Sequence, residues 1–98
     1  MPLTGTYGFG IIGCGVISDT HIEAIRRIPE AEVVAVCDAV EQRARDKAEQ
    51  YGAQAYTDHR EMLKRDDVHV VNVLTPSGHH HVAGIDAARA GKHVICTK

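Results

Sequence analysis

Two closely spaced glycines and a later carboxylate are the residues most suited to chemistry in this 98-residue chain. Residues 13–18 read Gly-Cys-Gly-Val-Ile-Ser and follow an apolar run at residues 8–12, while Asp38 ends the next apolar run. Gly13 lets the chain turn sharply out of a strand, and Gly15 lets backbone N–H groups approach a pyrophosphate at the positive end of the following helix. Asp38 follows at a spacing close to the roughly 20 residues expected for a ribose-binding acid. The pattern predicts a dinucleotide pocket, with Ser18 small enough to stand where a third glycine or alanine usually lies.

Asp38 allows two interpretations. It is either a carboxylate that binds the adenosine ribose or a turn residue that caps the helix expected from about Glu41. We favour ribose binding, because the end of the second strand is where the 2′-hydroxyl arrives. A carboxylate there repels a 2′-phosphate, so NAD is expected rather than NADP. Arg43 weakens this expectation, since its guanidinium could hold that phosphate or simply be solvated on the helix surface.

The elements that position these groups can be predicted from hydrophobic periodicity. Apolar runs at residues 7–13, 32–37, 68–74 and 93–96 are nearly continuous, which is typical of strands covered on both faces. Helical spacing occurs at residues 17–28, 41–51 and 79–90. A short edge strand is expected at residues 54–56, followed by a brief helix that extends to Lys64 and has Asp58 as its amino-terminal cap. The buried face of the first helix is predicted to contain Ile17, His21, Ala24, Ile25 and Ile28.

This alternation of strands and helices predicts an α/β fold, a doubly wound parallel sheet of the Rossmann type with strand order 3-2-1-4-5. The sequence stops directly after the last strand, so we expect residues 1–98 to form an incomplete dinucleotide-binding domain that lacks a carboxyl-terminal substrate domain. One sheet edge and one apolar face should then lack their usual cover, which favours self-association as a homo-oligomer.

Composition excludes several classes of function. With 44% hydrophobic and 24% charged residues, the chain has the composition of an ordinary globular protein, and a net charge of −2 gives no electrostatic reason for binding nucleic acid or a membrane surface. The amino terminus has neither a basic flank nor a long apolar stretch, so we expect no signal peptide and a cytoplasmic location.

Neither the cysteines nor the histidines predict a metal site or a disulfide framework. The three cysteines are widely spaced within or beside apolar runs, which favours reduced, packed thiols, and Cys14 is interpreted as a small residue in a tight turn rather than a reactive thiol. The three consecutive histidines at 79–81 point in different directions on a helix and cannot converge on one ion. His21 is expected to pack within the fold.

Further motifs make the chain resemble the Gfo/Idh/MocA family of oxidoreductases, over essentially its whole length and in their amino-terminal cofactor domain. The family's Glu-Lys-Pro segment corresponds here to Thr97 and Lys98, so threonine replaces the glutamate. The motifs that carry the resemblance are the glycine turn with His21, Asp38 with Arg43 and Ala44, the run from Thr75 through Pro76, Ser77 and Gly78 to His79 and His80, and residues 90–94 leading to Lys98.

The resemblance implies a role for each motif. Gly13, Gly15, Val16 and Ile17 are expected to bind the pyrophosphate, and Thr75, Pro76, Ser77, His80 and Thr97 to line the nicotinamide side. Lys98 falls on the lysine beside nicotinamide and substrate, where an ammonium can stabilise a developing alkoxide. The expected reaction transfers hydride between NAD and a secondary alcohol of a sugar, inositol or related polyol. The remaining acid/base groups are expected in a second domain, so the 98-residue chain alone should be inactive.

Two alternatives remain at the level of sequence. Thr97, in place of the family's glutamate, keeps open a dinucleotide-binding regulatory or interaction module without catalysis. The glycine turn is also compatible with a Rossmann-like domain that binds a different nucleotide.

Overall fold

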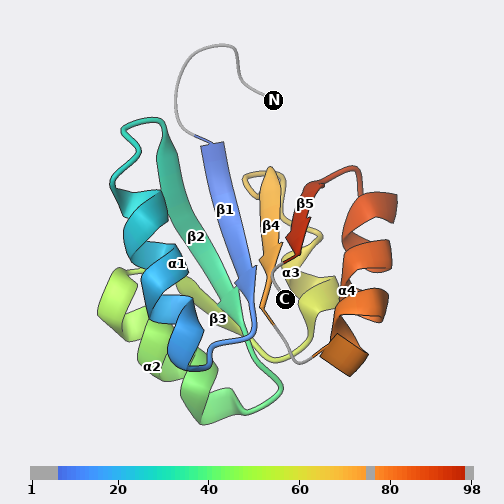
Figure 1. Ribbon diagram of the computed structural model, residues 1–98, viewed down its shortest axis with the longest axis horizontal. Coiled ribbons are helices and arrows are strands. Elements are labelled where there is room, and N and C mark those ends of the chain that lie inside the picture. Colours follow the sequence, from blue (N-terminus) through green and yellow to red (C-terminus); the bar gives the residue numbers. More distant parts are fainter. Residues whose placement is uncertain (1–6, 75–76, 97–98) are drawn as a thin grey trace.

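The computed structural model describes residues 7–74 and 77–96, without the side chains of residues 16, 17, 77–81 and 96. Its five strands form one parallel sheet in the order β3-β2-β1-β4-β5, as predicted (Figure 1). The elements in chain order are β1 (Tyr7–Ile12), α1 (Val16–Arg26), β2 (Ala31–Cys37), α2 (Glu41–Tyr51), β3 (Gln54–Tyr56), α3 (His59–Met62), β4 (Val70–Val73), α4 (Ser77–Arg89) and β5 (His93–Cys96).

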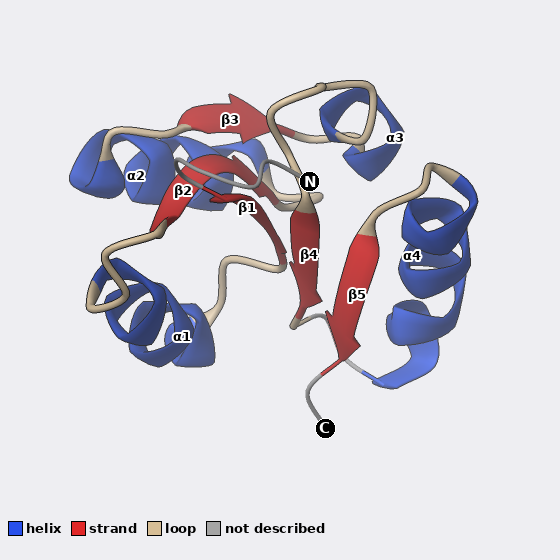
Figure 2. Cartoon of the chain, turned by 90° about the horizontal axis from the view of Figure 1, so that it is seen from above, coloured by secondary structure: helices blue, strands red, loops and turns tan. Residues whose placement is uncertain are grey.

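The helices form two layers around the sheet. Helices α1 and α2 cover one face, and α3 and α4 cover the other, as the view in Figure 2 shows. Each layer has its own buried cluster: Ile22, Ile25 and Ala48 pack against Ile11 and Val36 on the first face. On the second face, Met62, Ala83 and Ala87 pack against strand residues such as Val71 and Val73. The sheet is therefore held from both sides, as expected for nearly continuous apolar strands.

The predicted buried face of α1 was largely wrong. The helix buries Ser18, Ile22 and Ile25, at intervals of four and three, whereas Ala24 is exposed and Ile28 is 47% exposed beyond the helix end. Among the residues of the predicted face whose side chains are described, Ile25 alone is buried, and His21 is half-buried. The prediction was wrong because it placed only apolar residues, and His21, on the buried face and left out the serine. The predicted face is therefore rotated about the helix axis relative to the face that is buried.

The observed bounds of several other helices and strands differ from the predicted bounds by one to three residues. Helix α2 and strand β3 have their predicted bounds, and Asp58 caps α3 by accepting a hydrogen bond from the Arg60 N–H at 2.9 Å. Helix α3 is shorter than expected, since it ends at Met62, and α4 begins at Ser77 rather than at residue 79. Gly52, with a φ of 70°, ends α2 in the left-handed conformation that favours glycine.

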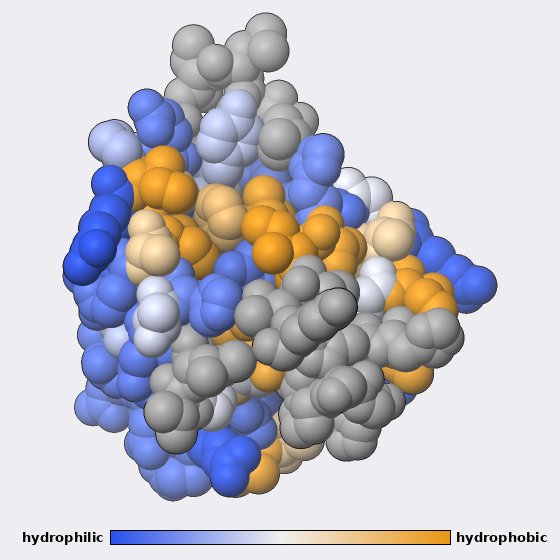
Figure 3. Space-filling view, viewed as in Figure 1, coloured by the Kyte–Doolittle hydropathy of each residue, from blue (hydrophilic) through white to orange (hydrophobic). Residues whose placement is uncertain are grey.

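Part of the sheet face that carries α1 is open to solvent. Figure 3 shows hydrophobic side chains gathered over β1, β4 and β5 on this side. Strand register places Ile11, Asn72 and Ile95 side by side, and Ile95 is 47% exposed. Asn72 is only 4% exposed, yet its Oδ1 has no hydrogen-bond partner among the described residues. A buried polar atom of this kind carries a desolvation cost, and nothing in the valine-rich run around Asn72 predicts it.

Candidate functional site

The carboxyl ends of four strands meet in one row of the sheet. Ile12 of β1 lies between Cys37 of β2 and Val73 of β4, and Val73 pairs with Cys96 of β5. The glycine turn follows Ile12, and Asp38 follows Cys37. Ligands of open α/β sheets bind at this edge, beyond the carboxyl ends of the strands. The topology thus brings the glycine turn and Asp38 to the same edge.

The glycine turn has the backbone that its sequence predicted. Gly13 has a φ of 100°, in the region that favours glycine, and its N–H donates to the Cys37 carbonyl at 2.7 Å. Gly15 precedes α1 with an ordinary φ of −78° and no side-chain cap. A Cβ at Gly15 would meet no atom within 4 Å. No neighbouring atom therefore requires glycine there, and the N–H groups that begin α1 follow directly, where an anion would approach.

Asp38 joins the glycine turn to the start of α2. Its Oδ2 accepts a hydrogen bond from the Cys14 N–H at 2.8 Å, and its Oδ1 accepts one from the Val40 N–H at 2.8 Å. The second bond is an Asx turn leading into α2, so the turn role considered for this residue is present. The ribose role is compatible with it, because a carboxylate has about four acceptor sites and two of them are used here.

Ser18 occupies the position of the family's third small residue without disturbing the turn. It is fully buried, and its hydroxyl donates to the Gly15 carbonyl at 2.6 Å. The hydroxyl is therefore satisfied within the first turn of α1. Serine is tolerated here, as expected from its size, because it is both small and able to form a local hydrogen bond.

The two described thiols are packed and unreactive in character. Cys14 and Cys37 are 4% and 3% exposed, and both are free. Burial, together with the smaller effect of the nearby Asp38 charge, raises the pKa of each thiol to about 12. The Cys14 thiol donates to the Cys37 carbonyl at 3.5 Å. Both residues are therefore neutral at physiological pH, in agreement with the interpretation of Cys14 as a small turn residue.

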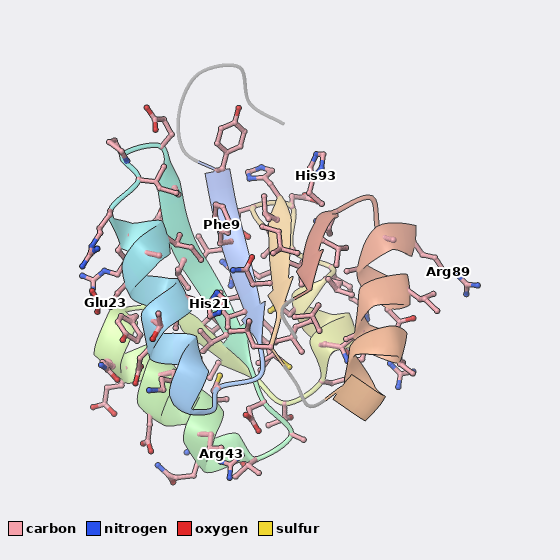
Figure 4. All side chains as sticks on the ribbon, in the orientation of Figure 1. Phe9, His21, Glu23, Arg43, Arg89 and His93 are labelled. Carbon is pink, nitrogen blue, oxygen red and sulfur yellow. The ribbon has the colours of Figure 1, made fainter. Side chains whose placement is uncertain are left out.

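The remaining predicted site residues are described unequally. Arg43 is an exposed residue of α2, and Figure 4 shows it at the end of the molecule where β1 and β2 terminate. Ser77 and His80 lie in the first half of α4, where only the backbone is described. Val16 and Ile17 begin α1 and are likewise described by backbone alone. Thr75, Pro76, Thr97 and Lys98 lie outside the described residues, so their roles remain predictions.

One ion pair beside the site was missed by sequence reasoning. Asp19, in the first turn of α1, bonds the ammonium of Lys47 from α2, and the Tyr51 hydroxyl donates to the same carboxylate oxygen at 3.0 Å. The partners are 28 residues apart in sequence. No local spacing rule could have found this pair, because it depends on how α1 packs against α2.

The described residues contain no cluster of three or more metal-ligating side chains and no helix long and apolar enough to cross a membrane. A groove of about 630 Å³ runs between α2 and β3, away from the glycine turn, and its lining includes Glu41, Arg45, Glu49 and Tyr56. The strand ends therefore remain the candidate site.

Comparison with known proteins agrees with this geometry. Residues 7–98 match the GFO_IDH_MocA family, described as an oxidoreductase family with an NAD-binding Rossmann fold. The chain belongs to the Gfo/Idh/MocA oxidoreductase family. Similar curated members of the family include an inositol 2-dehydrogenase of Burkholderia ambifaria, 40% identical over 96 residues, which cover 95% of this chain and 28% of that protein. A D-apiose dehydrogenase of Paraburkholderia graminis is 37% identical over 89 residues, covering 90% of this chain and 24% of that protein.

Solved structures of similar proteins have the same fold. The WlbA dehydrogenase of Bordetella pertussis, in complex with NADH and UDP-GlcNAcA, superposes with a TM-score of 0.87 at 34% identity, over 93% of this chain and 28% of that one. The 3-ketoreductase KijD10 of Actinomadura kijaniata, in complex with NADP, gives a TM-score of 0.87 at 32% identity, over 94% and 30% of the two chains. This chain thus spans less than a third of the length of these relatives.

Proposed function

We propose that this chain is the NAD-binding part of an oxidoreductase that transfers hydride to or from a secondary alcohol of a sugar, inositol or related polyol. The observation that carries the proposal is the 2.8 Å bond from the Cys14 N–H to Asp38, which holds the glycine turn and the ribose-binding candidate together at the open start of α1. Relatives named as inositol 2-dehydrogenase and D-apiose dehydrogenase support this substrate class.

Each part of the dinucleotide has a candidate partner in this chain. The backbone N–H groups of Gly15, Val16 and Ile17 are suited to a pyrophosphate, because they lie at the positive end of α1. Gly13, whose own N–H is bonded to the Cys37 carbonyl, is proposed to shape the turn that lets the pyrophosphate approach. Asp38 has acceptor capacity left for the ribose hydroxyls. Its negative charge disfavours a 2′-phosphate, so we propose NAD ahead of NADP. The exposed Arg43 is the residue through which NADP could still be accepted, and relatives are known with NADH and with NADP.

The reacting end of the site is proposed for the segments that follow β4 and β5. The nicotinamide supplies the hydride acceptor or donor when it is bound. Thr75, Pro76, Ser77, His80 and Thr97 are proposed to line that side of the cleft. Lys98 is proposed as the group whose ammonium stabilises negative charge that develops on the substrate oxygen.

The test separates binding from turnover. Titration with NADH, followed by calorimetry, is expected to show one site per chain, with weaker binding of NADPH. Asp38→Ala should weaken NADH binding, whereas Asp46→Ala, which changes an exposed carboxylate on α2, should not. No NADH binding by the unaltered chain would refute the proposal. We also expect no inositol-dependent reduction of NAD by the 98-residue chain, since further acid/base groups are proposed to come from a second domain.

A second candidate function is a dinucleotide-binding module that does not catalyse a reaction. Thr97, where the resemblance places a glutamate, is the observation in its favour. A protein containing this sequence together with a second domain should oxidise polyols if the enzyme proposal is correct. If it binds NADH tightly but shows no turnover with any polyol, the module is the better interpretation.

Self-association of the 98-residue chain is also proposed. Ile95 is 47% exposed on the open sheet face, and an unpaired strand edge favours contact with a second copy. Sedimentation at high concentration should show a dimer or larger species, and a monodisperse monomer would contradict this.

A further inference from the structure

The ion pair between Asp19 and Lys47 involves the first turn of α1, the helix that follows the glycine turn. The Lys47 side chain is only 16% exposed, while Asp19 is 46% exposed. The hydrogen bond from Lys47 is the largest cause that lowers the pKa of Asp19, so the carboxylate is ionised throughout the physiological range. The Tyr51 hydroxyl also donates to it, but burial and the Asp19 charge raise the pKa of Tyr51 to about 12. Tyr51 therefore contributes a bond and no charge, and Lys47 supplies the positive charge in this cluster.

The position of Asp19 matters for an anion site. A carboxylate in the first turn of a helix stabilises the helix, because it complements the positive end of the helix dipole. The same carboxylate opposes binding of a second anion at that end, because two negative charges then share one region of positive potential. Asp19 left uncompensated would reduce the attraction of the α1 amino terminus for a pyrophosphate.

The charge of Lys47 affects a residue of the glycine turn itself. Lys47 lowers the pKa of the Cys14 thiol, in opposition to burial and to the Asp38 carboxylate, which raise it. Cys14 is the central residue of the turn, and its N–H is bonded to Asp38. The electrostatic influence of Lys47 thus extends from α2 to the segment that is proposed to contact the phosphates.

We propose that Lys47 is a positioning residue for the dinucleotide site, one that compensates Asp19 and so keeps the amino terminus of α1 attractive to the pyrophosphate. Lys47 acts through Asp19 and the local potential rather than by touching the ligand. The inference rests on the proposed function, since it requires a phosphate-bearing ligand at the glycine turn.

The alternative is a purely structural tie between α1 and α2. The two roles can be separated because one depends on charge and the other on packing. Lys47→Met keeps the aliphatic stem and removes the charge, and Lys47→Arg keeps the charge. Asp19→Asn removes the opposing charge. Adenosine, which lacks phosphates, serves as a matched ligand for the same adenosine-ribose region.

The experiment is a titration of the 98-residue chain and its variants with NADH by calorimetry and with adenosine by NMR. At low salt, Lys47→Met should weaken NADH binding roughly three- to tenfold, and the loss should shrink at about 0.5 M salt, where the Debye length is only a few ångströms. Lys47→Arg should bind NADH nearly as well as the unaltered chain. Asp19→Asn should bind NADH at least as tightly as the unaltered chain, and the double variant of Asp19→Asn with Lys47→Met should recover the loss. Adenosine binding should be unchanged throughout.

Three results would overturn the inference. Equal NADH affinity of Lys47→Met and the unaltered chain would show that the charge has no role. Equal weakening toward NADH and adenosine, with no recovery in the double variant, would show a structural tie only. If Lys47→Met does not fold, weaker NADH binding by Asp19→Asn than by the unaltered chain is enough to refute the inference. Absence of NADH binding by the unaltered chain would instead refute the proposed function on which the inference rests.

Discussion

Replacement of Asp38 by alanine should destabilise the fold as well as weaken ligand binding. The carboxylate accepts two backbone hydrogen bonds of 2.8 Å, one from Cys14 in the glycine turn and one from Val40 ahead of α2. Alanine removes both acceptors. The Cys14 N–H lies in a partly buried setting, so its loss of a partner is not fully replaced by water.

The size of the effect follows from the setting of each bond. Hydrogen bonds to charged groups contribute about 1.5–3 kcal/mol when buried. We take about 1.5 kcal/mol for the partly buried bond to Cys14 and about 0.5 kcal/mol for the exposed bond to Val40, which gives about 2 kcal/mol for Asp38→Ala. For a domain of this size, that loss corresponds to a fall in the melting temperature of about 8–16 °C. Asp38→Asn retains one acceptor oxygen in place of two and should lose about half as much.

Thermal unfolding followed by circular dichroism measures this effect, with urea unfolding as a second estimate. Asp46→Ala is the matched control, because Asp46 is an exposed carboxylate on α2 whose described hydrogen bond is to the Gln42 side chain. It should change stability by less than about 0.5 kcal/mol. If Asp38→Ala melts within about 2 °C of Asp46→Ala, the two bonds do not hold the glycine turn and the reasoning fails.

Three further predictions concern the core, the thiols and the acid limit of stability. Ile22→Ala should cost about 2–4 kcal/mol of unfolding free energy and Ile28→Ala under about 1 kcal/mol, since Ile22 is fully buried and Ile28 is 47% exposed; similar costs in urea unfolding would contradict the observed face of α1. In a Cys96→Ser background, the other two thiols should react with a disulfide reagent at pH 8 only on unfolding, and rapid reaction of the folded chain would contradict their raised pKa values of about 12. The hydrogen bond from His59 holds the pKa of Asp86 below its usual range, so this bond stabilises the fold above an unfolded pKa near 4 and is lost as the pH falls below it. When the free energy of unfolding is measured in urea between about pH 3 and 6, its decrease toward acid pH should be smaller in Asp86→Asn than in the unaltered chain. The same pH profile in both proteins would count against this.

The sequence predicted the topology well because its signals are local. The alternation of apolar runs with helical segments, the glycine turn after the first run and the acid after the next together favour the order 3-2-1-4-5, which the structure has. The buried face of α1 was predicted poorly for the opposite reason. Ser18 is buried through a hydrogen bond to the Gly15 carbonyl, and hydrophobicity alone gives a serine no weight.

Tertiary contacts could not be predicted from the sequence for a related reason. Asp19 and Lys47 meet only when α1 and α2 pack on the same sheet face, and the Oδ1 of the buried Asn72, which lies between Ile11 and Ile95 in the strand register, has no hydrogen-bond partner among the described residues. Neither feature has a characteristic spacing. Both depend on which surfaces the fold brings together, and a periodicity argument treats Asp19 and Lys47 as solvated helix residues.

Three hydrogen bonds within the chain hold the glycine turn in place before any ligand binds. Gly13 donates to the Cys37 carbonyl, Cys14 donates to Asp38, and the Gly15 carbonyl accepts from Ser18. A turn fixed by three hydrogen bonds has already lost the backbone freedom that a flexible phosphate-binding loop loses when its ligand arrives, which costs about 1–2 kcal/mol per residue. Binding energy from a pyrophosphate is then available for affinity instead of being spent on ordering the loop. Substitutions that loosen any one of the three bonds should therefore weaken binding even where the substituted side chain does not contact the ligand.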